Sequence, residues 1–262
     1  MIYDYAYLKD EVYKLTGIDL NAYKDSQMKR RIESLIKRHN LGDYGIFCDA
    51  LKNDSDFLEE FKGYITINVS EFYRNPEQWE ILRKQILPGL INEFGRELNI
   101  WSSACSTGEE PYSLAMILSD FVPIEKINIL ATDIDKSVLK TARMGEYNNK
   151  NLAKLPYTYR NTYFTRDNSK GTYFLNDDLK KRVVFKEADL IHDKYPLFMH
   201  LVVCRNVLIY MSEEAQAEIY RKFYDSLVPG GVLFIGTTEQ IPAYKEIGYE
   251  RITSFFFRKP LK

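Results

Sequence analysis

One stretch constrains the fold of this chain most. In it, a short apolar strand leads through a turn of small residues into an acidic helix start. The stretch spans residues 99–118 and reads NIWSSACSTGEEPYSLAMIL. Small side chains in the turn let a ligand approach the backbone, and the start of the following helix offers free N–H groups. We therefore predict that this stretch is the first strand–helix unit of a nucleotide-type cofactor site.

The charge of this turn indicates which cofactor it binds. The stretch contains neither G-x-G-x-x-G, which binds a pyrophosphate, nor G-K-[ST], which binds a triphosphate. Glu109 and Glu110 stand where a phosphate would be repelled. A positively charged ligand is favoured instead, and S-adenosylmethionine, with its sulfonium and free amino group, fits better than NAD or ATP.

A second acidic residue follows the next expected strand. INILATDID reads as a buried strand over 127–132 that ends in Asp133. A carboxylate at the end of the second strand of a doubly wound sheet can accept hydrogen bonds from ribose hydroxyls. The two acidic segments together predict a cofactor site better than either does alone.

Both segments also allow a purely structural interpretation. In the turn, a capping box would pair a hydroxyl with a carboxylate, either Thr107 with Glu110 or Ser106 with Glu109. After the second strand, Asp133 or Asp135 would cap the helix expected near residue 136.

Hydrophobic periodicity changes near residue 75. Before this point helical periodicity dominates, and we expect four short helices at 7–15, 25–38, 45–52 and 55–65. After it, strands alternate with helices, as in a doubly wound sheet. A helical connection over 76–93 precedes expected strands at 98–102, 127–132, 183–186, 201–205, 231–236 and 254–258 and expected helices at 109–120, 136–143 and 212–227.

These elements predict an α/β fold with two domains. We expect a small all-helical N-terminal domain over 1–66, a linker over 67–75 that contributes to the cofactor site, and a Rossmann-like domain over 76–262. The polar segment 145–181, rich in Tyr and Asn, interrupts the alternation and is expected to form a small inserted β-subdomain.

Composition excludes several classes of function. The 36 basic and 37 acidic residues nearly balance, so the net charge favours neither nucleic acid nor an anionic membrane. Cys48, Cys105 and Cys204 are widely spaced in apolar or small-residue contexts, which is typical of reduced cysteines in a cytoplasmic protein. No metal-ligand spacing, bilayer-length apolar run or signal peptide is visible, so we expect neither a metal nor membrane insertion.

Five segments occur in the order NVSEFYRNPEQW, WSSACSTGEEPYSLA, ATDIDKSVLKTAR, VVCRNVLIYM and LVPGGVLFIGTTE. Together they resemble the CheR family of bacterial chemotaxis receptor methyltransferases, over nearly the whole chain. The resemblance implies a class I S-adenosylmethionine-dependent methyltransferase domain. It also implies methyl transfer to glutamate side chains on the cytoplasmic helices of transmembrane chemoreceptors, giving glutamate 5-O-methyl ester and S-adenosylhomocysteine for chemotactic adaptation. We expect a monomer.

The same resemblance implies a set of cofactor contacts: Asn68, Ser70, Arg74, Glu110, Asp133, Asp189, Leu190, Arg205 and Asn206. Glu110 would hold the methionyl amino group, with Glu109 as the second choice. Asp133 would hold the ribose, and Asp189 with Leu190 would meet the adenine.

Two residues are implied in catalysis, Arg74 and Tyr210, of which Tyr210 looks like the family's active-site tyrosine. Each site residue also has a structural alternative: Arg74 would pair with Glu71 or Glu77, Asp189 would cap a turn, and Tyr210 would be a core aromatic. Because a glutamate of unperturbed pKa about 4.3 is already an anion near neutral pH, the reaction needs no general base. Arg74 and Tyr210 are then expected to orient the substrate, and Arg74 also remains a cofactor candidate.

The expected second helix carries a basic stripe. At 100° per residue, one arc is apolar and another gathers Arg30, Arg31, Lys37 and Arg38. The apolar arc consists of Met28, Ile32, Leu35 and Ile36. A solvated charged face is the ordinary explanation, but such a stripe would also orient a glutamate-rich receptor helix, so we predict that it binds substrate.

Three further alternatives bear on function. The resemblance implies that some family members bind a C-terminal tether peptide of the receptor through a glycine-containing loop of the inserted subdomain. Here the corresponding segment, FTRDNSKGTYFL, contains only Gly171, so we do not predict such tethering, whereas strand addition by another partner peptide is an alternative. A nucleic-acid methyltransferase is disfavoured, because the residues at the end of the strand expected at 201–205 read CRNVLIY and not the D/N-P-P-Y motif that would present carbonyls to an exocyclic amine. A non-catalytic S-adenosylmethionine-binding module, or a methyltransferase of another protein, remains the alternative function.

Overall fold

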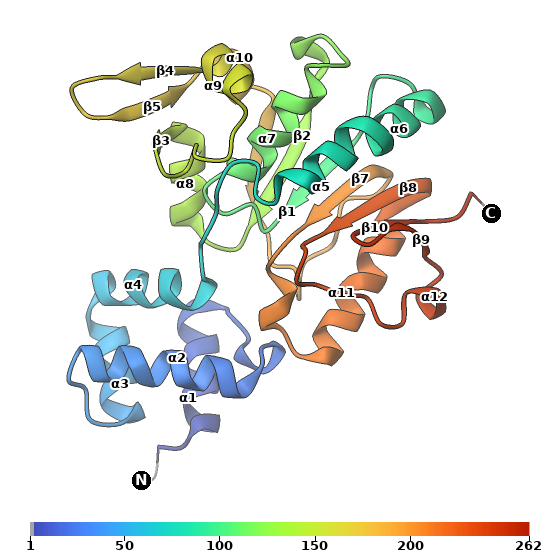
Figure 1. Ribbon diagram of the computed structural model, residues 1–262. Coiled ribbons are helices and arrows are strands. Elements are labelled where there is room, and N and C mark those ends of the chain that lie inside the picture. The colour runs from blue at the N-terminus through green and yellow to red at the C-terminus, as the bar shows by residue number, and fades with distance from the viewer. Residues whose placement is uncertain (1–2, 262) are drawn as a thin grey trace. The chain divides into compact units, whose positions relative to one another are not determined.

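The computed structural model describes residues 3–261, which divide into two compact units (Figure 1). One unit holds the described residues up to Asn68 together with Leu208–Gln216. The other unit holds Val69–Val207 and the described residues from Ala217 onward. The chain therefore leaves the second unit after Val207 and re-enters it at Ala217.

Four helices form most of the first unit: α1 (Tyr5–Thr16), α2 (Asp25–Arg38), α3 (Tyr44–Asn53) and α4 (Ser55–Thr66). A 3-10 turn at Leu20–Ala22 connects α1 to α2. Carboxylates accept first-turn N–H groups at the starts of α1, α3 and α4 and so define where these helices begin. The four predicted helices are confirmed, and the apolar arc of α2 is buried as expected.

The segment Leu208–Gln216 joins the helical unit through its backbone. Tyr23 and Met211 form an antiparallel bridge, and Lys24 donates its N–H to the carbonyl of Tyr210 at 2.9 Å. Ser212 donates its N–H to the carbonyl of Ala22 at 2.8 Å. Because these bonds use only backbone groups, no side-chain pattern in the sequence announces them.

A seven-stranded sheet forms the centre of the second unit, in the order β6-β2-β1-β7-β8-β10-β9. Its strands are β1 (Ile100–Ser103), β2 (Ile129–Asp133), β6 (Val183–Glu187), β7 (Met199–Cys204), β8 (Leu227–Ile235), β9 (Glu250–Thr253) and β10 (Phe256–Arg258). The first five pair in parallel, and β10 runs antiparallel to both β8 and β9. The predicted doubly wound sheet is confirmed, whereas β9 was not foreseen.

The carboxyl ends of the five parallel strands meet at one edge of this sheet, where open α/β sheets bind ligands. Before β1 the chain forms α5 (Pro76–Ile81), a π-helical turn (Leu82–Ile86) and α6 (Leu87–Phe94). The helices that follow β1 are α7 (Glu109–Leu118), α8 (Lys136–Met144), α11 (Glu213–Ser226) and α12 (Tyr244–Ile247). A short 3-10 turn lies at Ile124–Lys126, and another, at Leu208–Tyr210, belongs to the first unit. None of the helices within residues 3–261 has the length and hydropathy needed to cross a membrane.

The inserted segment forms a second, three-stranded antiparallel sheet in the order β3-β5-β4. Its elements are β3 (Glu146–Asn148), α9 (Tyr157–Tyr163), β4 (Phe164–Asp167), β5 (Thr172–Leu175) and α10 (Asp177–Lys180). Figure 1 shows this sheet beside α8 and separate from the main sheet. Tyr147 on β3 packs its ring against Phe72, with the ring centroids 4.8 Å apart.

Candidate functional site

The turn after β1 has an unusual backbone. Ala104, Ser106 and Gly108 all have positive φ angles, of 53°, 49° and 93°. A Cβ atom on Gly108 would lie 3.0 Å from the Cβ of Ala142 and 3.1 Å from the Tyr147 hydroxyl, so only glycine fits there. Non-glycine residues in this conformation are costly and cluster at functional sites, which makes this turn a candidate site.

Neither capping box forms at the start of α7. The cap residue is Gly108, which has no side chain to accept an N–H. Thr107 instead donates its hydroxyl to Glu109 Oε2 at 2.7 Å. The structural interpretation of this acidic turn is therefore wrong, and its carboxylates are held by other groups.

Glu110 lies largely buried between a hydroxyl and a guanidinium. Ser102 donates its hydroxyl to Glu110 Oε1 at 2.9 Å, and Arg205 Nη1 is 3.7 Å from Glu110 Oε2. Burial raises the pKa of Glu110 to about 7, although Arg205 and the Ser102 hydrogen bond lower it. Such a carboxylate gains from a cationic ligand, because the positive charge favours its ionised form.

Glu109 is completely buried and its two carboxylate oxygens are engaged within the protein. Besides the Thr107 hydroxyl at Oε2, the side-chain amide of Asn151 donates to Oε1 at 2.9 Å, and Ser70 also hydrogen-bonds to this carboxylate. Burial raises the pKa of Glu109. Glu109 thereby links the segment after Asn68, the turn and the inserted subdomain.

Asp133 ends β2 and organises the neighbouring loops. Its Oδ2 accepts the N–H of Ser106 at 2.8 Å, and its Oδ1 accepts the N–H of Asp135 at 3.0 Å. Burial raises the pKa of Asp133 to about 6, against the lowering effect of these backbone bonds. Asp135, not Asp133, caps α8, by accepting the N–H of Ser137 at 2.8 Å.

Asp189 lies just after β6, at the same edge as Asp133. The N–H of Ala188 donates to the Asp133 carbonyl at 3.0 Å, which joins the two strand ends. Asp189 Oδ1 accepts the N–H of Ile191 at 2.7 Å, so this residue does cap a turn, as its structural alternative proposed. Leu190, next to it, is buried.

Arg205 and Asn206 follow β7. The buried Arg205 donates through Nη2 to the carbonyl of Arg74 at 2.7 Å and to Asn75 Oδ1 at 3.2 Å. Its guanidinium also lies 4.7 Å from the ring centroid of Phe234. These contacts hold the residues after Ser70 and the end of β7 together. Asn206 has a positive φ of 61°.

Three other predicted residues, Arg74, Asn68 and Tyr210, make contacts of their own. Arg74 donates through Nη1 to the carbonyl of Val69 at 3.3 Å. Glu71, one of its alternative partners, pairs with Lys154 at 2.7 Å. Asn68 and Tyr210 belong to the helical unit. There, Asn68 Nδ2 donates to Thr66 Oγ1 at 2.9 Å, and Tyr210 contributes the carbonyl that accepts from Lys24.

One acidic residue at the same edge was missed. Glu239 follows β8 and is buried, with its carboxylate bound to backbone N–H groups of the loops after β7 and β8. Acidic residues follow the first two predicted strands, and the same pattern after the strand predicted at 231–236 points to Glu239.

Two family models match the chain in sequence. The model for the "CheR methyltransferase, SAM binding domain" matches residues 68–254, and the model for the "CheR methyltransferase, all-alpha domain" matches residues 3–66. The chain belongs to the CheR methyltransferase family. It is an S-adenosylmethionine-dependent methyltransferase, as the resemblance of the five segments predicted.

Curated relatives of this CheR chain bear the name "Chemotaxis protein methyltransferase". Those of Listeria monocytogenes and Listeria innocua are 43% and 42% identical over 256 residues, covering 98% of this chain and 97% of each relative. The relative from Borreliella burgdorferi is 32% identical over 250 residues, covering 91% of this chain and 88% of its own length. The similarity therefore extends through both units.

The basic stripe on α2 of the CheR chain is less uniform than its sequence indicates. Arg30 and Lys37 are exposed. Arg31 is partly buried: it donates to the Tyr64 carbonyl on α4, and its guanidinium lies 4.5 Å from the Tyr64 ring centroid. Arg38 is 3.5 Å from Glu60 Oε1. Arg31 thus joins α2 to α4, in addition to any role in binding.

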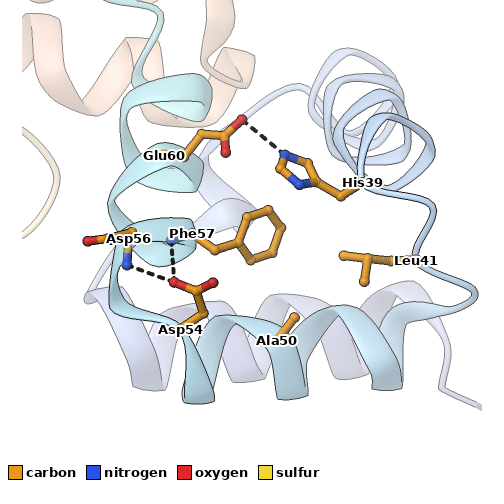
Figure 2. A pocket seen from close by; sticks show the side chains of 7 residues that line it. All are labelled: His39, Leu41, Ala50, Asp54, Asp56, Phe57 and Glu60. Carbon is orange, nitrogen blue, oxygen red and sulfur yellow. Dashed lines mark hydrogen bonds and ion pairs between the residues drawn. The ribbon is translucent and has the colours of Figure 1, made fainter.

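The helical unit also contains a pocket with a volume of about 340 Å³ (Figure 2). It is lined by His39, Leu41, Ala50, Asp54, Asp56, Phe57 and Glu60. Asp54 accepts the N–H groups of Asp56 and Phe57 at 3.0 Å, and Glu60 contacts the His39 ring at 3.1 Å (Figure 2). These carboxylates serve helix capping and packing, and the pocket shares no residue with the predicted site.

Proposed function

We propose that this CheR protein transfers the methyl group of S-adenosylmethionine to glutamate side chains on the cytoplasmic helices of chemoreceptors, for chemotactic adaptation. The products are a glutamate 5-O-methyl ester and S-adenosylhomocysteine. The observation that carries the proposal is the buried Glu110 carboxylate at the end of the sheet, in a chain whose curated relatives are chemotaxis methyltransferases.

The residues at this edge fit the cofactor chemically. Ser106 Oγ, Asn206 Oδ1 and Arg205 Nε are buried and have no hydrogen-bond partner among the described residues. Buried polar atoms without partners are costly, and a ligand with polar groups would satisfy them. The raised pKa of Glu110 also fits a ligand with a cationic group, because a positive charge beside this buried carboxylate favours its ionised form.

We assign the contacts as follows. Glu110 holds the methionyl amino group, with Glu109, which is completely buried and binds Thr107 and Asn151, as the second choice. Asp133 holds the ribose hydroxyls through its remaining lone pairs. The adenine lies against Asp189 and Leu190. The other cofactor contacts are Asn68, Ser70, Arg74, Arg205 and Asn206.

When bound, S-adenosylmethionine supplies a methyl group activated by the adjacent sulfonium charge. The acceptor glutamate is already ionised near neutral pH, so the protein needs no base to remove a proton. Arg74 and Tyr210 orient this carboxylate toward the methyl carbon. Because opposite charges neutralise during transfer, exclusion of water and alignment by these side chains lower the barrier.

The receptor helix binds to the basic stripe of α2. Arg30, Lys37 and Arg38 present positive charge, and Arg31 adds charge from its place between α2 and Tyr64. Charges of one sign on one helix face would steer and orient an acidic receptor surface. We place this reaction in the cytoplasm, in keeping with three cysteines that are free and buried.

Peptide mapping tests the proposed substrate. The purified chain is incubated with S-adenosylmethionine and receptor-enriched membranes, and receptor peptides are examined by mass spectrometry. We expect an added methylene on glutamate side chains of the cytoplasmic helices. Methylation of lysine, of nucleic acid, or of no receptor residue would contradict the proposal.

A further inference from the structure

Glu239 is the last residue of the segment LVPGGVLFIGTTE, and it makes a set of contacts that the predicted site does not include. Its Oε2 accepts the N–H of Asn206 at 2.9 Å and the N–H of Gly236 at 2.6 Å. Its Oε1 accepts the N–H of Val207 at 3.0 Å. One buried carboxylate therefore binds two consecutive amides of the loop after β7 and one amide of the loop after β8.

The two loops approach each other closely around this carboxylate. A Cβ atom on Gly236 would lie 2.8 Å from the backbone nitrogen of Asn206 and 2.8 Å from Glu239 Oε2. Across the same gap, Asn206 Nδ2 donates to Thr238 Oγ1 at 3.3 Å. Gly236 thus permits the approach that lets Glu239 reach the amides beyond β7.

The clamped loop carries two of the proposed cofactor residues. Asn206 has a φ of 61°, a conformation that costs an asparagine energy unless its surroundings hold it. Arg205, which precedes it, has its Nη1 3.7 Å from Glu110 Oε2. Val207, whose N–H also binds Glu239, is the last residue of the stretch Val69–Val207. The segment Leu208–Gln216, which contains Tyr210, follows directly in the chain. A change at Glu239 would reach these residues through the backbone.

We propose that Glu239 is a positioning residue for the cofactor site, which holds the loop 205–207 in the conformation that presents Arg205 and Asn206 to the ligand. The inference rests on the proposed function, since it assumes that this edge binds S-adenosylmethionine. Glu239 does not itself contact the cofactor or the acceptor. Its effect passes through the backbone amides that it binds.

Two variants separate positioning from folding. Glu239→Met keeps the length of the side chain but removes every acceptor, and Glu239→Gln keeps one carbonyl oxygen. Asp54→Ala is the matched control, because it removes a carboxylate that accepts two backbone N–H groups in the helical unit and that is none of the proposed cofactor contacts. For each variant, calorimetry measures S-adenosylhomocysteine affinity under conditions where it is folded, and thermal unfolding measures stability.

We expect Asp54→Ala to unfold at a lower temperature but to bind S-adenosylhomocysteine as tightly as the parent. Glu239→Met should weaken binding by about 10- to 100-fold, the range for hydrogen bonds to a charged group, with Glu239→Gln between it and the parent. Gly236→Ala, which separates the loops while retaining Glu239, should weaken binding as well.

The results also separate this inference from the proposed function. If the parent itself does not bind S-adenosylhomocysteine, the proposed function fails. If the parent binds and the Glu239→Gln and Glu239→Met proteins bind equally well while losing only stability, Glu239 has a merely structural role and the inference is wrong. If Glu239→Met does not fold, Glu239→Gln decides alone, and parental affinity in that variant overturns the inference.

Discussion

The side-chain amide of Asn151 donates a hydrogen bond to Glu109 Oε1 at 2.9 Å, which ties the inserted subdomain to the first turn of α7. The same residue accepts the N–H of Phe72 through its carbonyl at 3.0 Å. Lys154, also in the insertion, pairs with Glu71 at 2.7 Å. The insertion is therefore bonded to the first turn of α7 and to the segment that precedes α5.

Removal of the Asn151 amide tests the importance of this junction. Asn151→Ala leaves the buried Glu109 carboxylate without one of its donors, which should lower the free energy of unfolding by about 1–3 kcal/mol. Urea denaturation measures this loss. Asn149→Ala is the control, because Asn149 is exposed and contacts Arg160 instead. Equal stability of the two variants would contradict the expected role of Asn151.

The raised pKa of Glu110 leads us to predict opposite pH dependences for protein stability and for ligand binding. Its folded-state pKa of about 7 exceeds the ordinary value of about 4.3, so the folded protein holds a proton that the unfolded chain has lost. Stability of the ligand-free protein should therefore fall as pH rises from about 4.5 to about 7. Affinity for S-adenosylhomocysteine should rise over the same window, because its ammonium group favours ionised Glu110.

Glu110→Gln supplies the control for this prediction. The amide does not titrate, so calorimetry between about pH 5 and about pH 8 should show a weaker and flatter pH dependence of binding than in the parent. A residual slope below pH 6 is expected from Asp133, whose pKa is raised to about 6. A pH dependence identical to that of the parent would remove Glu110 from the site.

Arg31 and the exposed residues of the basic stripe should respond differently to substitution. Arg30→Glu with Lys37→Glu changes only exposed side chains, so the double variant should keep its thermal stability and cofactor affinity while receptor methylation falls. Each exposed charge is expected to contribute roughly 0.2–1 kcal/mol, so single changes should have small effects. Arg31→Ala should instead lower stability, because it removes the contacts with Tyr64.

Salt dependence separates steering from a merely solvated helix face. Receptor methylation by the parent should slow as salt rises, and the Arg30→Glu, Lys37→Glu variant should lose much of this dependence. If the double variant methylates receptor at the parental rate in low salt, α2 does not recognise the receptor. The inserted subdomain would then be the next surface to test.

Substitutions at Arg74 and Tyr210 should affect turnover more than they affect the affinity for S-adenosylhomocysteine. If Arg74 orients the acceptor carboxylate, Arg74→Ala should reduce turnover by about 100-fold while weakening S-adenosylhomocysteine much less. Tyr210→Phe should reduce turnover more moderately and leave the fold intact, with Tyr157→Phe at an exposed position as control. Parallel losses of turnover and affinity in Arg74→Ala would make Arg74 a cofactor residue instead.

The sequence predicts those features of the candidate site that depend on which residue types stand next to a strand. Asp133 and Glu110 could be found because acids are unusual beside buried apolar strands. The structure places the Asp133 carboxylate at the end of β2 and the Glu110 carboxylate in the first turn of α7, after β1. The helical ranges could be found because burial follows the 3.6-residue period, as in α2. Both signals are local.

Contacts made by backbone groups could not be predicted in the same way. Glu239 binds amides more than thirty positions away, and any residue type except proline could supply them. Tyr210 offers a carbonyl to Lys24, so its segment joins the helical unit without a side-chain signal. Arg31 appeared to belong to a free basic face because helical periodicity cannot show that Tyr64 on α4 lies against it.

Transfer of tritiated methyl from S-adenosylmethionine to receptor-enriched membranes tests the central claim most directly. We expect that the parent chain labels the receptor band, that mild base releases the label as expected for a glutamate methyl ester, and that Glu110→Gln labels far more slowly at neutral pH. Label that resists base, or that appears equally without receptor, would contradict the account.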